Sequence, residues 1–66
     1  MQVLKTIYSA KTGKMIGEIF QDGSVFAFCH CVTDEFQTEF LSFDQAYDAF
    51  LGFYYDWKEN LQLSQI

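Results

Sequence analysis

Arginine and proline are absent from this chain of 66 residues, and cysteine occurs only twice. Without arginine, four lysines face nine carboxylates, and the net charge is −5. This balance disfavours binding to nucleic-acid phosphates, which clustered basic side chains recognise, and binding to anionic membrane surfaces. Because there is no proline, no internal repeat and no low-complexity segment, the sequence predicts a single domain over residues 1–66 without a linker.

Long apolar runs are also missing. No segment approaches the roughly 20 apolar residues that a membrane-spanning helix requires. The first residues lack the uninterrupted apolar region of a signal peptide. With two cysteines and no export signal, the chain is expected to be a cytoplasmic protein that does not contact a membrane.

Aromatic residues are abundant: eight Phe, four Tyr and one Trp make up 20% of the chain. A domain of this size buries only about 60% of the surface that its unfolded chain exposes, so its core needs large side chains. Each buried ring removes roughly 150–250 Å² from water. An aromatic core without disulfides is therefore expected.

Two glycine-containing turns divide the first half of the chain. Thr12-Gly13 and Asp22-Gly23 are typical of tight hairpin turns, in which glycine takes a positive φ. The segments around them are short and rich in β-branched and aromatic residues, a composition that favours strands. The expected strands cover about residues 2–9, 15–20 and 24–32.

The periodicity changes in the second half. Residues 35–40 read EFQTEF, and their alternation predicts a fourth strand at the sheet edge, with an extended loop as the alternative. Apolar residues then recur at spacings of three and four, which predicts a helix over about residues 43–61 that begins with a Ser42–Gln45 capping box. The predicted class is α+β: a three- or four-stranded antiparallel β-meander with one C-terminal amphipathic α-helix packed on one face.

Cys29, His30 and Cys31 are consecutive in the third predicted strand. Side chains alternate along a strand, so the two cysteines share one face and the histidine lies on the other. Their Cβ atoms would be roughly 7 Å apart, too far for a disulfide, and a structural zinc ion needs four ligands. The cysteines are therefore expected to be small core residues, with a zinc site shared between two chains as the alternative. No metal and no cofactor is predicted for the single chain.

His30 has two interpretations. A general base needs a nucleophile and an orienting carboxylate nearby, and no Ser or Cys lies beside His30 on its own face. A histidine between apolar neighbours is more often structural, with one of its two nitrogens hydrogen-bonded. We therefore predict no catalytic residue and a protein that is not an enzyme.

Acidic residues follow one another without an intervening base in the middle of the chain. A carboxylate pair for glycoside hydrolysis would also need a cleft, for which so short a chain has little volume. Two interpretations remain: a solvated face that aids solubility, or a surface that docks on a basic partner or imitates a nucleic-acid backbone. The predicted acidic interaction residues are Asp34, Glu35, Glu39, Asp44 and Asp48.

The apolar residues exceed what one helix can cover. The third predicted strand is apolar on both faces, whereas one helix covers only one face of a sheet. A helix of about 19 residues spans roughly 28 Å, more than the ~17–20 Å of a typical strand, so its last turns should extend past the sheet. Exposed aromatic rings on those last turns are typical anchors of protein interfaces. Stacking of nucleobases on the same rings would need basic side chains nearby to pair with the phosphates. The predicted apolar interaction residues are Leu51, Tyr54, Tyr55, Trp57 and Leu61.

These patterns predict a small acidic, non-enzymatic protein–protein interaction module with a regulatory or inhibitory role. Its partner is expected to be a second copy, bound through the open sheet face or the overhanging helix, or another protein with a basic surface. The alternative function is a small nucleic-acid-binding protein that uses the meander with Lys5, Lys11 and Lys14. The net charge of −5 makes nucleic acid the weaker candidate.

Overall fold

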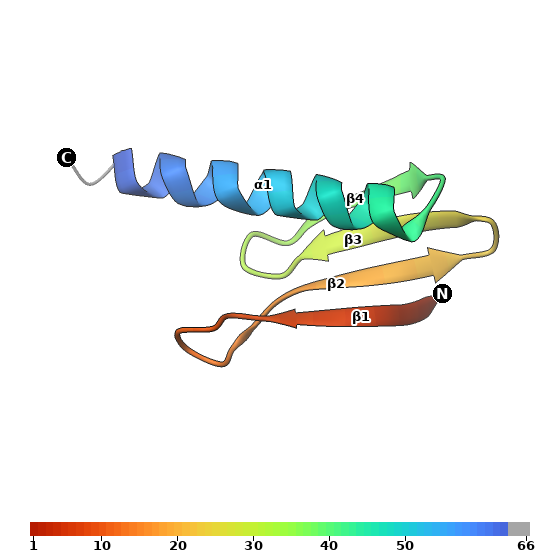
Figure 1. Cartoon of the computed structure of the whole chain (residues 1–66), viewed down its shortest axis with the longest axis horizontal. Coiled ribbons are helices and arrows are strands. Elements are labelled where there is room, and N and C mark those ends of the chain that lie inside the picture. Colours follow the sequence, from red (N-terminus) through yellow and green to blue (C-terminus); the bar gives the residue numbers. More distant parts are fainter. Residues whose placement is uncertain (64–66) are drawn as a thin grey trace.

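A computed structural model describes residues 1–63 as a four-stranded antiparallel sheet with one helix across it (Figure 1). The elements are β1 (Gln2–Tyr8), β2 (Met15–Asp22), β3 (Val25–His30), β4 (Glu35–Phe40) and α1 (Phe43–Leu63). Strands adjacent in sequence are adjacent in the sheet, in the order β1-β2-β3-β4. The α+β meander is confirmed, and the fourth segment is a strand and not a loop.

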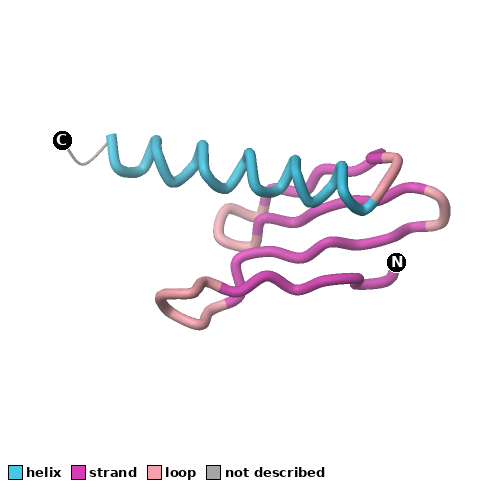
Figure 2. Tube along the Cα trace, viewed as in Figure 1, coloured by secondary structure: helices cyan, strands magenta, loops and turns pink. Residues whose placement is uncertain are grey.

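Both predicted glycine turns are present as short loops between strands (Figure 2). Gly13 has a φ of 72° and Gly23 a φ of 64°, a region that other residues rarely adopt. Asp22 pairs with Val25, so two residues suffice to connect β2 to β3. The local turn chemistry therefore determines which strands pair.

The third strand is shorter than predicted, because it ends at His30 and not at residue 32. The chain turns through the next four residues, where the Thr33 N–H donates to the His30 carbonyl oxygen at 3.3 Å. Asp34 completes the turn with a φ of 59°, which aspartate tolerates better than most residues. Cys31 and Val32 consequently lie in the turn.

The strict alternation expected for β4 is interrupted. Its pairing with β3 shifts register between Gln37 and Phe40, and Glu39 has a φ of 73°. The irregularity brings the Phe40 ring onto Phe28, at a centroid distance of 5.9 Å, on the face that the helix covers. Phe36 stays on the opposite face, so the two β4 phenylalanines serve different surfaces.

The core lies between α1 and the central strands. Its fully buried side chains are Ile19, Phe28, Ala46 and Phe50. The ring of Phe50 packs directly on the backbone of Gly17 in β2, where a Cβ atom would overlap it. The helix contacts β2, β3 and β4 but not β1, so one strand of the covered face lies beside the helix and not beneath it.

The start of α1 follows the predicted capping pattern. The Gln45 N–H donates to Ser42 Oγ at 3.1 Å, and the Leu41 N–H donates to Gln45 Oε1 at 3.0 Å. The reciprocal bond thus reaches the residue before the cap, but the effect is the same, because two donors at the helix start are satisfied. From there α1 runs beyond the end of the sheet (Figure 1), as its predicted length required.

Candidate functional site

The sheet face opposite α1 carries two phenylalanine rings that meet above β3. Phe20 in β2 pairs with Ala27, Phe36 in β4 pairs with Cys29, and the ring centroids are 6.2 Å apart. The rings lean over β3 from both sides, which explains why Ala27 is only 1% exposed on a face without a helix. Phe36 is still 48% exposed, so this open face keeps a large apolar side chain in contact with water.

Smaller side chains surround the two rings. By register and strand alternation, they include Val3, Thr6, Glu18, Asp22, Val25, Ala27 and Cys29. Val3 is exposed, while Val25 and Cys29 are half-buried. The two rings therefore form an apolar ridge with smaller apolar side chains beside it, and Glu18 and Asp22 are charged members of the set.

The two cysteines are free thiols, both half-buried. Burial, together with the neighbouring Cys29 thiol and the negative charges of Glu18 and Asp34, raises the pKa of the Cys31 thiol to about 11. Cys31 is thus protonated at neutral pH, a poor nucleophile and a poor metal ligand. Among residues 1–63, no group of three or more His, Cys, Asp or Glu side chains could hold a metal ion, and a zinc site shared between two chains stays a prediction.

His30 lies on the covered face, fully buried beneath the helix. Its Nδ1 is hydrogen-bonded to Thr33 Oγ1 at 2.8 Å, and its ring contacts those of Phe53 and Trp57 edge to face, at 5.0 and 5.1 Å. Nε2 has no hydrogen-bond partner within the described chain. Burial lowers the pKa of His30, and the charge of Glu35 opposes this only in part. The expected surroundings, apolar neighbours and one hydrogen-bonded nitrogen, are observed, and a purely structural role for His30 stays a prediction.

The acidic residues do not form one row. Asp34 and Glu35 lie at one end of β4, and the half-buried Glu35 accepts a hydrogen bond from Gln37 Nε2 at 3.1 Å. Glu39 lies near the other end of the strand. Because each residue of a strand adds about 3.3 Å of length, Glu39 is well separated from Asp34 and Glu35. The remaining two, Asp44 and Asp48, are exposed one turn apart on α1.

The predicted aromatic residues of the helix have different surroundings. Trp57 and Tyr54 are half-buried with their rings near His30, whereas Tyr55 is 62% exposed. Leu51 is half-buried, and Leu61 is exposed on the last turns. Tyr55 is therefore the clearest exposed ring of the set, while Trp57 mainly completes the core.

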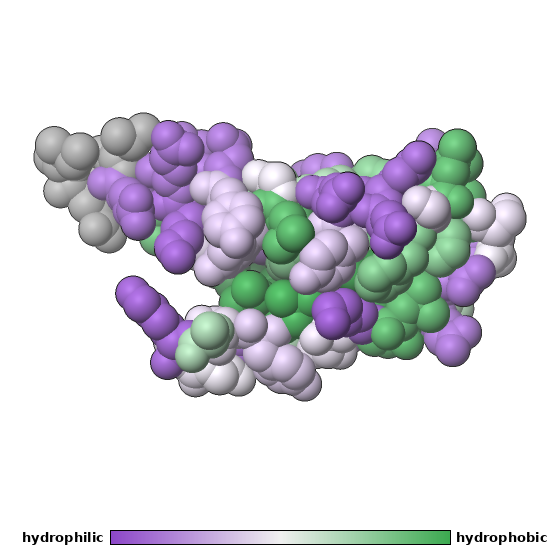
Figure 3. Space-filling view, in the orientation of Figure 1, coloured by the Kyte–Doolittle hydropathy of each residue, from purple (hydrophilic) through white to green (hydrophobic). Residues whose placement is uncertain are grey.

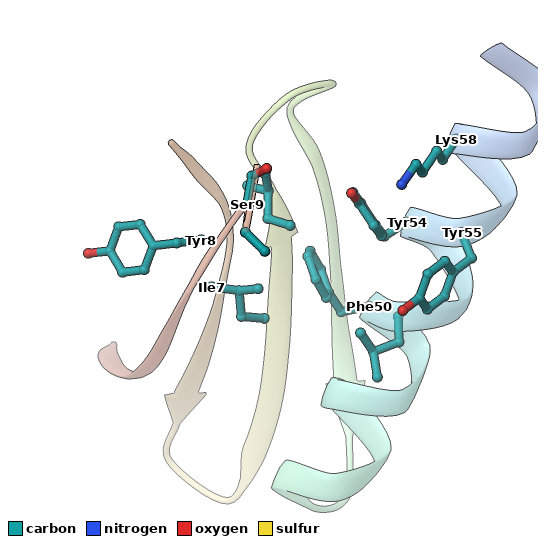
Figure 4. Close-up of a pocket in the computed structure, with 10 residues that line it drawn as sticks. Ile7, Tyr8, Ser9, Phe50, Tyr54, Tyr55 and Lys58 are labelled. Atoms are coloured by element: carbon teal, nitrogen blue, oxygen red, sulfur yellow. The ribbon is translucent and has the colours of Figure 1, made fainter. Parts of the chain in front are cut away.

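A groove that the sequence did not indicate separates the helix from β1. It has a volume of about 260 Å³ and lies between the end of β1 with its following turn and residues 50–58 of α1 (Figure 4). Its position depends on where the helix crosses the sheet, which no local sequence pattern encodes. The apolar spacing of α1 does place Phe50 and Tyr54 on the covered side of the helix, and this was the available signal.

Among the described residues, α1 is the one element with the length of a membrane-spanning helix, and it is too polar to cross a membrane. No protein-family model, no curated protein and no solved structure matches this chain. The candidate functional surfaces are therefore the open sheet face, the exposed acids of α1 and the groove.

Proposed function

We propose that this protein is a small, non-enzymatic protein–protein interaction module that forms a homodimer through its open sheet face. The observation that supports this proposal is the half-exposed Phe36 ring, which stands against Phe20 on a face that no helix covers. Contiguous exposed apolar surface is typical of interaction sites. The commonest soluble oligomer is a two-fold dimer in which the same patch of both copies meets.

The open face has a shape that a second copy can match. Two sheets pack face to face about 10 Å apart, with side chains from both interdigitating. With a two-fold axis through the open face, the Phe20 and Phe36 rings of each copy would pack against the smaller side chains around Val25 and Cys29 of the other copy. Free cysteine behaves as a small apolar residue, so the thiols are suited to burial in such an interface.

Replacing Phe36 by serine tests the dimer. The variant Phe36→Ser removes an apolar ring from each copy, and burial of a Phe side chain is worth about 1.5–3 kcal/mol. We expect a rise of at least tenfold in the dimer dissociation constant, measured by size-exclusion chromatography with light scattering over a concentration series. Because Phe36 is half exposed in the monomer, circular dichroism should show an intact fold.

The matched control is Tyr55→Ser, which removes an exposed ring from the helix and leaves the sheet face unchanged. It should leave the dissociation constant unaltered. Loss of the dimer in Tyr55→Ser but not in Phe36→Ser would assign the interface to the overhanging helix, and a wild-type protein that stays monomeric at high concentration would refute the dimer. Dissociation by a chelator would indicate the shared zinc site.

The exposed acids of α1 are proposed to dock on a basic partner. Asp44→Lys combined with Asp48→Lys reverses both charges, and of the two carboxylates Asp44 lies in the first turn, where its interaction with the helix dipole stabilises by about 0.3–1 kcal/mol. We expect a modest loss of stability and a tenfold or greater loss of affinity for a lysine-rich peptide at low salt, measured by fluorescence anisotropy.

The control for this pair is Asp56→Lys combined with Glu59→Lys, which makes the same change in net charge farther along the same helix. It should lower the affinity for the peptide less than the first pair of substitutions does. Equal losses in both pairs would show that net charge alone attracts the peptide, and the assignment to Asp44 and Asp48 would then be wrong.

A further inference from the structure

The groove between β1 and α1 has apolar walls from both layers of the fold. Ile7 of β1 and Ile16 of β2 form the sheet side, and Phe50 and Leu51 form the helix side. Figure 4 shows Ile7 and Phe50 directed toward each other across the space, while the Tyr8 ring points away. The space-filling view shows a hollow with an apolar floor between the helix and the sheet (Figure 3).

The polar groups of the groove lie at its rim, and the charged one is a cation. Lys58 Nζ is 5.9 Å from the centroid of the Tyr54 ring, a cation–π distance that holds the ammonium group over the helix side. Among residues 1–63, no aspartate or glutamate lines the groove, although the protein has a net charge of −5. Its lining is therefore complementary to an apolar ligand that ends in a negative charge.

Ser9 supplies a second polar group on the opposite rim. Its Oγ accepts hydrogen bonds from the backbone N–H groups of Lys11 and Thr12, each at 3.3 Å. These bonds fix the hydroxyl oxygen in the turn and leave its own proton free to be donated. An anionic group near the mouth of the groove could thus meet the Lys58 ammonium on one side or the Ser9 hydroxyl on the other.

The volume limits the size of the ligand. A methylene group occupies roughly as much space as a water molecule in the liquid, about 30 Å³. The groove of about 260 Å³ therefore has room for an unbranched chain of about eight or nine carbon atoms, with the carboxylate at the rim. We propose that the groove binds a free medium-chain fatty acid, with its chain against Ile7, Phe50 and Leu51 and its carboxylate at Lys58.

This site is independent of the proposed dimer. The groove lies on the helix side of the sheet, whereas Phe20 and Phe36 lie on the other side. Binding in the groove and association through the open face can therefore be measured separately. Failure of one proposal does not imply failure of the other.

The test is a titration of the whole protein with sodium decanoate below its critical micelle concentration, followed by amide chemical shifts in NMR. Shifts should concentrate at residues 7–10, 16 and 50–58, and decyltrimethylammonium, which has the same chain and the opposite charge, should bind at least tenfold more weakly. Lys58→Gln should lower the affinity for decanoate about tenfold. The control Lys5→Gln removes a lysine that does not line the groove and should leave the affinity unchanged.

Two further variants sharpen the result. Leu51→Trp fills the groove from a half-buried helix position and should abolish decanoate binding, while Phe36→Ser should retain it. Equal affinity for the anionic and cationic probes, no effect of Lys58→Gln, or shifts outside the groove would each overturn the proposal. Loss of decanoate binding in a monomeric but folded Phe36→Ser variant would place the ligand between two copies and would also overturn it.

Discussion

Gly17→Ala is expected to lower the free energy of unfolding by about 1–3 kcal/mol, as overpacking of a well-filled core does. A Cβ atom at position 17 would overlap the Phe50 ring and lie 3.1 Å from the carbonyl oxygen of Cys29. Phe50 is fully buried among Ile19, Phe28 and Ala46, so its ring cannot move aside freely. For a domain that is marginally stable at this length, such a loss unfolds a measurable fraction of the molecules. Urea denaturation followed by circular dichroism measures the change.

The matched glycine control is Gly52→Ala. Gly52 lies within α1, and a methyl group there would meet nothing within 4 Å beyond its own stretch of helix, so alanine should stabilise the helix by up to about 1 kcal/mol. Combining Gly17→Ala with Phe50→Leu should recover part of the lost stability, because the smaller side chain makes room for the methyl group. A Gly17→Ala variant as stable as the wild type would mean that Phe50 does not pack on this backbone.

The elements could be predicted because their signals are local. Gly13 and Gly23 have the positive φ angles that their turns require. Ser42 and Gln45 make the capping bonds at the start of α1. Once hairpins and one helix were assigned, short connections left the meander as the simplest arrangement.

The details that the sequence did not reveal arise from the backbone and from tertiary packing. Asp34 and Glu39 have positive φ without being glycine, so neither the early end of β3 nor the register shift in β4 had a clear signal. Because of that shift, Phe36 and Phe40 lie on opposite faces despite their even spacing.

The candidate surfaces were predictable in part for the same reason. Hydrophobic patterning indicated an open apolar face, but not that Phe20 and Phe36 would cover part of it themselves. The groove requires α1 to lie over β2 to β4 and to leave β1 uncovered, which follows from the contact of Phe50 with Gly17. A contact between two residues so far apart along the chain has no local signature.

Acidification is expected to destabilise the protein through His30. Burial lowers the pKa of His30 in the folded state, while the unfolded chain has the usual value of about 6.5. The unfolded state therefore binds the proton first, so stability is greatest above about pH 6.5 and falls below it, by at most about 1.4 kcal/mol per pH unit for one proton. The fall ends once the pH is below the folded-state pKa. Urea midpoints at pH 7.5, 6.5 and 5.5 measure this slope.

Because His30 is the one histidine in the sequence, its removal should isolate the effect. In His30→Leu, stability should be nearly constant between pH 7.5 and 5.5, since ordinary carboxylates titrate near pH 4. Among the described residues, Glu35 from β4 is the charged group that acts on the ring and favours the imidazolium, and the Tyr54 ring of α1 packs against it. Stability that rose on acidification would require a raised folded-state pKa, which would mean that Glu35 outweighs burial and that His30 is a charged partner within the core.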